Sequence, residues 1–208
     1  MEIDDLPRAL IAELPSGIGT ATAASLTAAN LEVSVAAAVT GPKIESAIDQ
    51  LLVSTGTPDI LVLGVLGSGS PALFTELEPA GWWTEVEYRL SVTFGWVKAV
   101  AAAMSRRPRA RIVFVVDDSG VSGAFAASVE STISSATIAM AKSLARELGP
   151  VGIAVNAVAV AAGPGSATEL VAQSQPVAET IAFLADVRLP ALTGQIIACN
   201  GGRTRTRI

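Results

Sequence analysis

A short glycine turn near the start of the chain could hold a phosphate group. Gly17 and Gly19 stand one residue apart and lead from a short apolar run into an alanine-rich stretch. Backbone N–H groups at the start of a helix bind anions, so this pattern is typical of a nucleotide cradle. Two residues before the turn oppose that chemistry, because the carboxylate of Glu13 repels an anion and Pro15 has no N–H to donate. The glycines would equally let a helix pack closely on a sheet.

The chain is poor in side chains that move protons near neutral pH. It has no histidine, which removes imidazole catalysis and the commonest metal ligand, so no metal site is expected. Tyr88 is its only tyrosine. A tyrosine is a useful acid near neutral pH only when a cation lowers its pKa from about 10.

Composition limits the class of protein. The chain has 208 residues, of which 50% are hydrophobic and 16% charged, so one domain with a sizeable core is expected. The net charge of −5 and the lack of a basic stretch argue against nucleic acid as a partner. Cys199 is the only cysteine, which fits a reducing compartment, and no apolar run is long enough for a membrane span. We therefore expect a cytoplasmic protein that contacts no membrane.

The elements that must position any site alternate along the chain. Short β-branched runs are followed by helical, often alanine-rich stretches, which is typical of an α/β fold with a parallel sheet covered on both faces. No repeat or linker interrupts the pattern, so a single domain over residues 1–208 is predicted. Strands are expected at 8–14, 31–39, 59–66, 109–118, 152–160 and 193–201, and helices at 17–29, 41–55, 81–105, 125–148 and 169–185.

Four segments, in the right order, resemble one family. They are "SGIGTATA", "TPDILVLG", "AKSLARELGPVGIAVNAVA" and "AFLADVRLPALTGQIIACNGG". With them the chain resembles the short-chain dehydrogenase/reductase family nearly from end to end. The resemblance implies a Rossmann-like doubly wound sheet and NAD(P)-dependent hydride transfer between an alcohol and a carbonyl.

The resemblance also implies a tyrosine, a lysine four residues later, a serine and an asparagine as the catalytic set. The register of "SLAREL" places the tyrosine position at Glu130 and the lysine position at Ser134. Counting back along "IVFVVDDSG" places the serine position at Asp117, and the first long helix places the asparagine position at Arg89. All four are substituted, Tyr88 lies beside the wrong position, and no lysine has the required spacing. No catalytic residue is therefore expected in this chain.

The cofactor site departs from the family pattern as well. In the family's glycine-rich turn, Ala12 replaces a threonine and Glu13 replaces the first glycine, while Gly17 and Gly19 remain. The family's "NNAG" turn is replaced by "LGVL" at residues 63–66. The stretch between the glycine turn and "DILVLG" is short by about one strand and one helix, so a sheet of about six strands is expected. A second short stretch, before the last helix, shortens the family's substrate lid. We expect no cofactor bound by this chain.

Together these substitutions favour a non-catalytic, structural subunit. The expected partner is an active NAD(P)-dependent alcohol dehydrogenase or ketoreductase of the same family, in a heterotetramer, with NAD or NADP bound by that partner. The resemblance implies a subunit interface in which the two long helices of one subunit and the same two of a second subunit form a four-helix bundle. Small outer residues on the corresponding helices of this chain favour such an interface.

Two alternatives stay open. One is an active but atypical NAD(P)-dependent oxidoreductase that uses Asp117 or Glu130, and the other is a stand-alone ligand-binding protein. Arg89, Asp117 and Glu130 stand at positions that converge in this fold, and two carboxylates close together are costly unless a cation joins them. We therefore expect Arg89 to form an ion pair with Asp117 or Glu130 and to fill the former active site.

Overall fold

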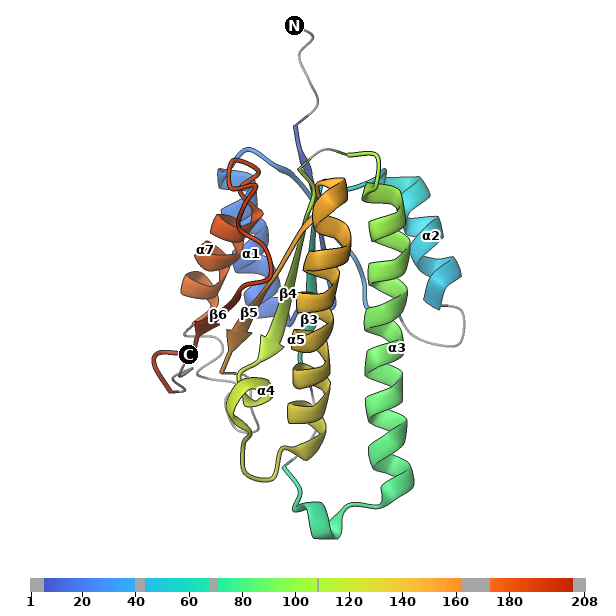
Figure 1. Ribbon diagram of the computed structural model, residues 1–208, viewed down its shortest axis with the longest axis vertical. Coiled ribbons are helices and arrows are strands. Elements are labelled where there is room, and N and C mark those ends of the chain that lie inside the picture. The colour runs from blue at the N-terminus through green and yellow to red at the C-terminus, as the bar shows by residue number, and fades with distance from the viewer. Residues whose placement is uncertain (1–5, 40–43, 68–70, 108, 162–172, 204–208) are drawn as a thin grey trace, which may run out of the picture.

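The computed structural model describes residues 6–39, 44–67, 71–107, 109–161 and 173–203. Within them, six parallel strands form one sheet in the order β2-β1-β3-β4-β5-β6 (Figure 1). This confirms the predicted α/β, Rossmann-like fold with a sheet of about six strands. The strands are β1 Arg8–Ala12, β2 Glu32–Val35, β3 Ile60–Val65, β4 Arg111–Asp117, β5 Ala154–Val160 and β6 Ile196–Cys199.

Helices cover both faces of the sheet (Figure 1). One face carries α1 Ser16–Ala28 and α7 Ser174–Ala185, and the other carries α2 Ile44–Thr55, α3 Pro79–Met104 and α5 Ser128–Leu148. Shorter turns connect them: η1 Phe74–Glu76, α4 Ser119–Ser122 and η2 Gly149–Val151.

The central strands are apolar along their whole length because both of their faces are covered. Every residue of β3, β4 and β5 is buried. Alternate side chains point to opposite faces, so Leu61 and Leu63 join the core under α3 and α5, whereas Ile60 and Val62 join the core under α1 and α7.

Each of the two long helices packs on the sheet through one stripe of buried side chains. Helix α3 begins at Pro79, a residue suited to the first turn of a helix. Its buried side chains Val92, Trp96 and Val100 recur every four residues and face the core. The opposite side of α3 is left on the outside of the molecule.

The strand order locates the crevice where this class of fold binds ligands. The direction in which successive strands are added to the sheet reverses between β1 and β3, and ligands of doubly wound sheets bind outside the carboxyl ends of the strands at that point. Beyond β1 the described sheet has only β2, whereas the nucleotide-binding order 3-2-1-4-5-6 has two strands there. In the described part of the chain, no helix is both long enough and apolar enough to cross a membrane.

Candidate functional site

The four positions that the sequence alignment matches to the family's catalytic residues lie in one region, at the carboxyl ends of β3 and β4. Val65 pairs with Val116, so the residues that follow them, Leu66 and Asp117, lie next to each other. Helix α3 reaches the same place, because Arg89 Nη1 donates to the carbonyl oxygen of Leu66 over 3.1 Å.

Helix α5 supplies the other two positions. Ser134 Oγ accepts a 3.1 Å hydrogen bond from the backbone N–H of Asp117. Glu130 lies one helical turn earlier and packs against Gly67, where an added Cβ would lie 2.6 Å from its Cγ. Glu130 therefore fills the space next to the end of β3, and only a glycine fits beside it.

The predicted pairing of Arg89 is wrong. Among the described residues, its ion pair is with Glu85, with 2.9 Å between Nε and Oε1, and not with Asp117 or Glu130. Glu85 lies one turn earlier on α3, and residues four apart on a helix are neighbours. The guanidinium of Arg89 therefore pairs with a carboxylate of its own helix.

Asp117 is a buried carboxylate with few partners. Its side chain is 1% exposed, and Oδ1 accepts from the backbone N–H of Ser119 over 2.8 Å. Within the described residues Oδ2 has no hydrogen-bond partner. Such an oxygen is costly to bury, and it takes the place where the family has the hydroxyl that binds the substrate.

At the positions aligned with the family's tyrosine and lysine, this chain has Glu130 and Ser134. Glu130 is 7% exposed and lies in the first turn of α5, where the helix dipole stabilises a negative charge. Ser134, at the lysine position, is neutral and buried, and α4 packs on it so closely that a Cβ on Gly120 would lie 2.5 Å from its own.

At the glycine turn, Glu13 stands in a left-handed conformation. Its φ is +57°, in the region that favours glycine and where the family has its first glycine. The carboxylate is held on two sides: Oε1 accepts from the N–H of Val39 at 2.9 Å and from the indole of Trp96 at 3.3 Å. Glu13 therefore ties the turn to the segment after β2 and to α3.

A neighbouring glycine makes this turn possible. A Cβ on Gly64 would lie 2.2 Å from the carbonyl oxygen of Glu13, so the two backbones are in close contact. Gly64 occupies one of the asparagine positions of the family's "NNAG" turn. Where the family has an asparagine side chain, Gly64 has none, and β3 contacts the backbone of the turn directly.

The two remaining glycines of the turn are part of helix α1. Gly17 and Gly19 lie in the first turn of α1, and Gly19 N–H already donates to the carbonyl oxygen of Pro15 over 2.8 Å. A cavity of about 350 Å³ lies beside them, between the turn and the end of β2. Its wall at the end of β2 is formed by Val35 and Ala36. Neither has a side chain able to bind the ribose hydroxyls that a dinucleotide presents there.

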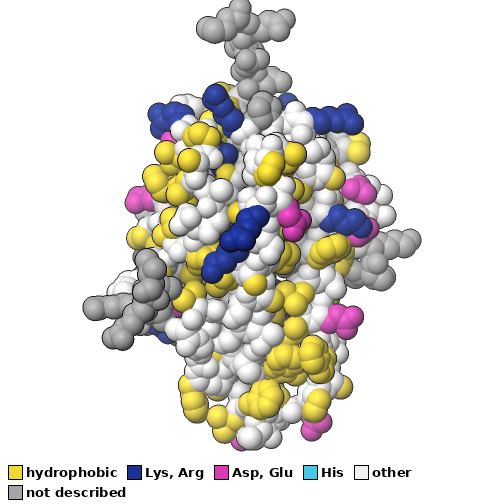
Figure 2. Space-filling model, viewed as in Figure 1, with side chains coloured by type: hydrophobic (Ala, Val, Ile, Leu, Met, Phe, Trp, Pro, Cys, Tyr) yellow, Lys and Arg dark blue, Asp and Glu magenta, His cyan; other side chains and the backbone are white. Residues whose placement is uncertain are grey.

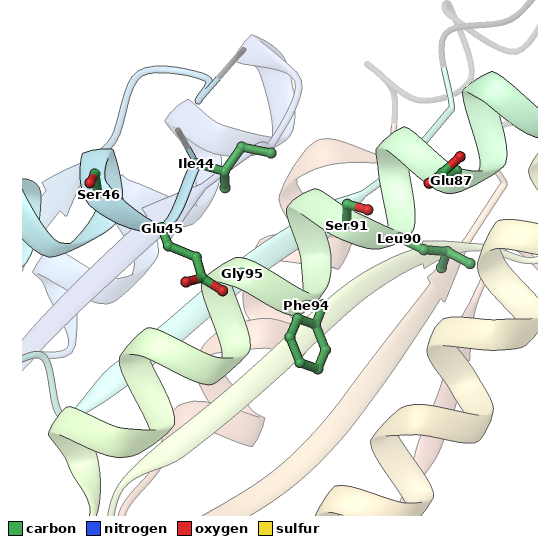
Figure 3. A pocket seen from close by; sticks show the side chains of 8 residues that line it. All are labelled: Ile44, Glu45, Ser46, Glu87, Leu90, Ser91, Phe94 and Gly95. Atoms are coloured by element: carbon green, nitrogen blue, oxygen red, sulfur yellow. The ribbon is translucent and has the colours of Figure 1, made fainter. Parts of the chain in front are cut away.

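Another hollow lies on the outside of α3. A cavity of about 780 Å³ lies between the start of α2 and α3. Figure 3 shows Leu90 and Phe94 projecting from α3, with Glu45 reaching over the helix from α2. Phe94 is 57% exposed, and Glu45 forms an ion pair with Lys98. This hollow belongs to the outer helix face and not to the former catalytic region.

Comparison with known proteins identifies the family. A family model described as short chain dehydrogenase matches residues 38–176. The 3-oxoacyl-[acyl-carrier-protein] reductase FabG of Escherichia coli is 30% identical over 182 residues, covering 79% of this chain and 74% of the reductase. The chain therefore belongs to the short-chain dehydrogenase/reductase family.

Two further comparisons extend this result. A chain named (2S)-[(R)-hydroxy(phenyl)methyl]succinyl-CoA dehydrogenase subunit BbsD, from Thauera aromatica, is 28% identical over 178 residues, covering 77% of this chain and 71% of that one. A crystal structure of an oxidoreductase of the family from Burkholderia thailandensis superposes with a TM-score of 0.80 at 23% identity, over 96% of this chain and 93% of that chain.

Some features of the site were missed from sequence. The contacts of Glu13 with Val39 and Trp96, and its close approach to Gly64, join segments far apart in the chain, and no local pattern signals them. The short helix α4, which closes over Ser134, was not predicted either. The shortened lid before the last helix falls mainly on residues 162–172 and lies outside the described residues.

Proposed function

We propose that this chain is a non-catalytic subunit of a hetero-oligomeric short-chain dehydrogenase/reductase. The observation that carries the proposal is the buried cluster at the four catalytic positions. Asp117, Glu130 and Ser134 are buried, and Arg89 is engaged with Glu85 and Leu66. The family's reaction needs a tyrosine beside a lysine, and a serine hydroxyl for the substrate oxygen. In this chain Glu130, Ser134 and Asp117 stand at those three positions.

We infer that NAD or NADP is bound by the partner subunit. Three features of the turn and of the cavity beside it support this. Glu13 stands where the family has its first glycine, Pro15 has no N–H, and Val35 with Ala36 offers nothing to the ribose. Incubation of the purified chain with NADH or NADPH should give no enhancement of cofactor fluorescence and no thermal shift. Saturable binding at micromolar cofactor contradicts the inference.

The outer surfaces of α3 and α5 are the proposed interface. The outer side of α5 carries small residues such as Ser135 and Ala139, which let another helix approach closely. The outer side of α3 exposes Trp83, Leu90 and Phe94, of which Leu90 is partly buried. Figure 2 shows hydrophobic side chains gathered at the lower end of this face. Exposed apolar surface of this kind favours a protein partner.

The relatives supply a precedent for division into subunits. BbsD is itself named as a subunit of a dehydrogenase. Two copies of this chain with two active chains would give a closed tetramer. The predicted cytoplasmic location is a further part of this proposal and awaits a direct measurement.

Co-expression with the active family member encoded beside this chain tests the proposal. With a tag on one chain only, both should purify together in a fixed ratio. Turnover should be abolished by replacing the partner's catalytic tyrosine, and unaffected by Glu130→Gln here. Phe94→Glu should weaken assembly, whereas Val53→Glu, at an 87% exposed position on α2, should not. A well-behaved monomer, with a partner that assembles and works equally well alone, refutes the proposal.

A second candidate is an active oxidoreductase with an atypical residue set. It is favoured by the relatives, since FabG is named a 3-oxoacyl-[acyl-carrier-protein] reductase. In that case Asp117 or Glu130 would take part in proton transfer. Turnover by the purified chain alone, lost on Glu130→Gln, would establish it.

A further inference from the structure

A set of arginines lies at the edge of the sheet where the strands begin, opposite the former catalytic region. In Figure 1 this edge is at the top, and Figure 2 shows basic side chains there. Several have acidic partners: Arg8 with Glu32, Arg107 with Asp59 and Arg188 with Asp186. Arg109 and Arg111 differ from these, because neither forms an ion pair with a described residue.

Arg111 is the buried member of this pair. It is the first residue of β4 and is 2% exposed. Its guanidinium donates to backbone carbonyls only: Nη1 to Ala110 at 3.1 Å, and Nη2 to Val187 at 3.2 Å and to Asp186 at 3.5 Å. Nε is buried and has no acceptor among the described residues. Bonds from an arginine to a carboxylate or phosphate are typically about 2.7–2.9 Å, so this guanidinium lacks a strong acceptor.

The carboxylate whose charge acts on Arg111, that of Asp186, is already hydrogen-bonded to Arg188. Asp186 receives bonds of 2.9 and 3.0 Å from Arg188 Nε and one of 2.7 Å from Nη2. Burial lowers the pKa of the Arg111 guanidinium, the charge of Asp186 raises it, and the charge of Arg109 lowers it further. Arg111 thus has a like charge nearby and a carboxylate neighbour that is bound to another arginine.

Arg109 is exposed and held in an unusual conformation. Its φ is +68°, which few residues other than glycine and asparagine adopt without strain. Together with Arg111 it lines a cavity of about 480 Å³. Thr193 and the apolar residues Val151, Ile153 and Pro190 also line it. This volume lies in the range of small-molecule sites, which are mostly apolar with a few polar groups.

We propose that this cavity binds the oxyanion of a small metabolite, a carboxylate or a phosphate ester, between Arg109 and Arg111. A buried cation that forms no ion pair is costly, and an anion bound beside it lowers that cost. Arginine suits the task because its planar fork matches carboxylate and phosphate oxygens. The apolar wall would contact the body of the ligand. The site is at the opposite edge of the sheet from the glycine turn and does not depend on the subunit role proposed above.

Titration of the full-length chain with inorganic phosphate and, separately, with succinate tests this site. Binding is followed by calorimetry and by thermal shift, with sodium chloride at matched ionic strength as the reference. We expect saturable binding of at least one anion at one site per chain. The stronger of the two identifies the ligand as a phosphate ester or a carboxylate. Neither anion exceeding sodium chloride overturns the proposal.

Variants separate a built site from a general effect of positive charge. Arg109→Ala should weaken binding about tenfold, as loss of a charge-assisted bond does. Arg106→Ala removes the same charge from an exposed position that does not line the cavity, and should change affinity by less than about twofold, as an exposed charge does. Equal losses in the two variants overturn the proposal. Arg111→Lys keeps the charge without the fork and should also weaken binding; if it does not fold, the comparison of Arg109→Ala with Arg106→Ala decides.

Discussion

Replacing Glu13 tests whether its carboxylate anchors the turn. In Glu13→Gly, the 2.9 Å bond to Val39 N–H is lost, and a part-buried bond to a charged acceptor contributes about 1.5–3 kcal/mol. The longer bond to Trp96 adds less. Glycine relieves the left-handed backbone by about 1 kcal/mol but costs part of that gain through the freer unfolded chain. The net expectation is a loss of about 2 kcal/mol.

For a chain of this length that loss lowers Tm by about 4–8 °C. Urea unfolding followed by tryptophan fluorescence measures the same change as a free energy. Glu13→Gln is the matched control: it keeps an acceptor oxygen and the same backbone, so it should lose only about 1 kcal/mol. If Glu13→Gly is as stable as the parent chain, the carboxylate is not an anchor. If the same variant binds NADH or NADPH tightly, the loss of the cofactor site has been overestimated.

Three further outcomes follow from the packing and the charges. Gly64→Ala places a Cβ 2.2 Å from a backbone oxygen and should cost about 3 kcal/mol or more in urea unfolding, whereas Gly81→Ala, in open space on α3, should be neutral or stabilising. Ser134→Lys should cost about 3 kcal/mol in the same assay, because it overfills a buried position, and should restore no turnover even with a tyrosine four residues earlier. Hydrogen bonds from Arg188 lower the pKa of Asp186 to about 2. Since the folded pKa is depressed, the stability from this group is present above about pH 4 and is lost as the pH falls toward 2. Carboxyl NMR should give that midpoint, and Arg188→Ala should move it up toward 4.

The fold was predictable because its signals are local. Apolar β-branched runs and helical, often alanine-rich stretches follow one another along the chain, and the segments resembling the family are in the family's order. Boundaries were less secure. The strand predicted at 31–39 ends at Val35, because the chain then turns so that Val39 can donate to Glu13. Helix α3 begins at Pro79, two residues earlier than predicted, although a proline at the first helical position is a recognised start signal.

The site was predictable in position and less so in its contacts. The register along α5 and β4 correctly brought Asp117 and Ser134 together. The predicted ion pair of Arg89 with Asp117 or Glu130 was wrong, because Glu85 lies four residues earlier on the same helix and pairs with it. This spacing is visible in the sequence. Contacts such as Trp96 with Glu13 depend on how two distant segments pack, and no spacing along the chain encodes them.

The position of β2 at the border of the sheet has a consequence for aggregation. A border strand presents unpaired N–H and C=O groups on which a strand of another molecule can add. Strand β2 is only four residues long, and its Glu32 forms an ion pair with Arg8, so it offers a short and charged template. The interior strands β3 and β4 keep two neighbours each. A sheet that lacks a further strand beyond β2 therefore keeps its interior strand pairs. Its resistance to the addition of a strand from another molecule then depends on the length and charge of β2.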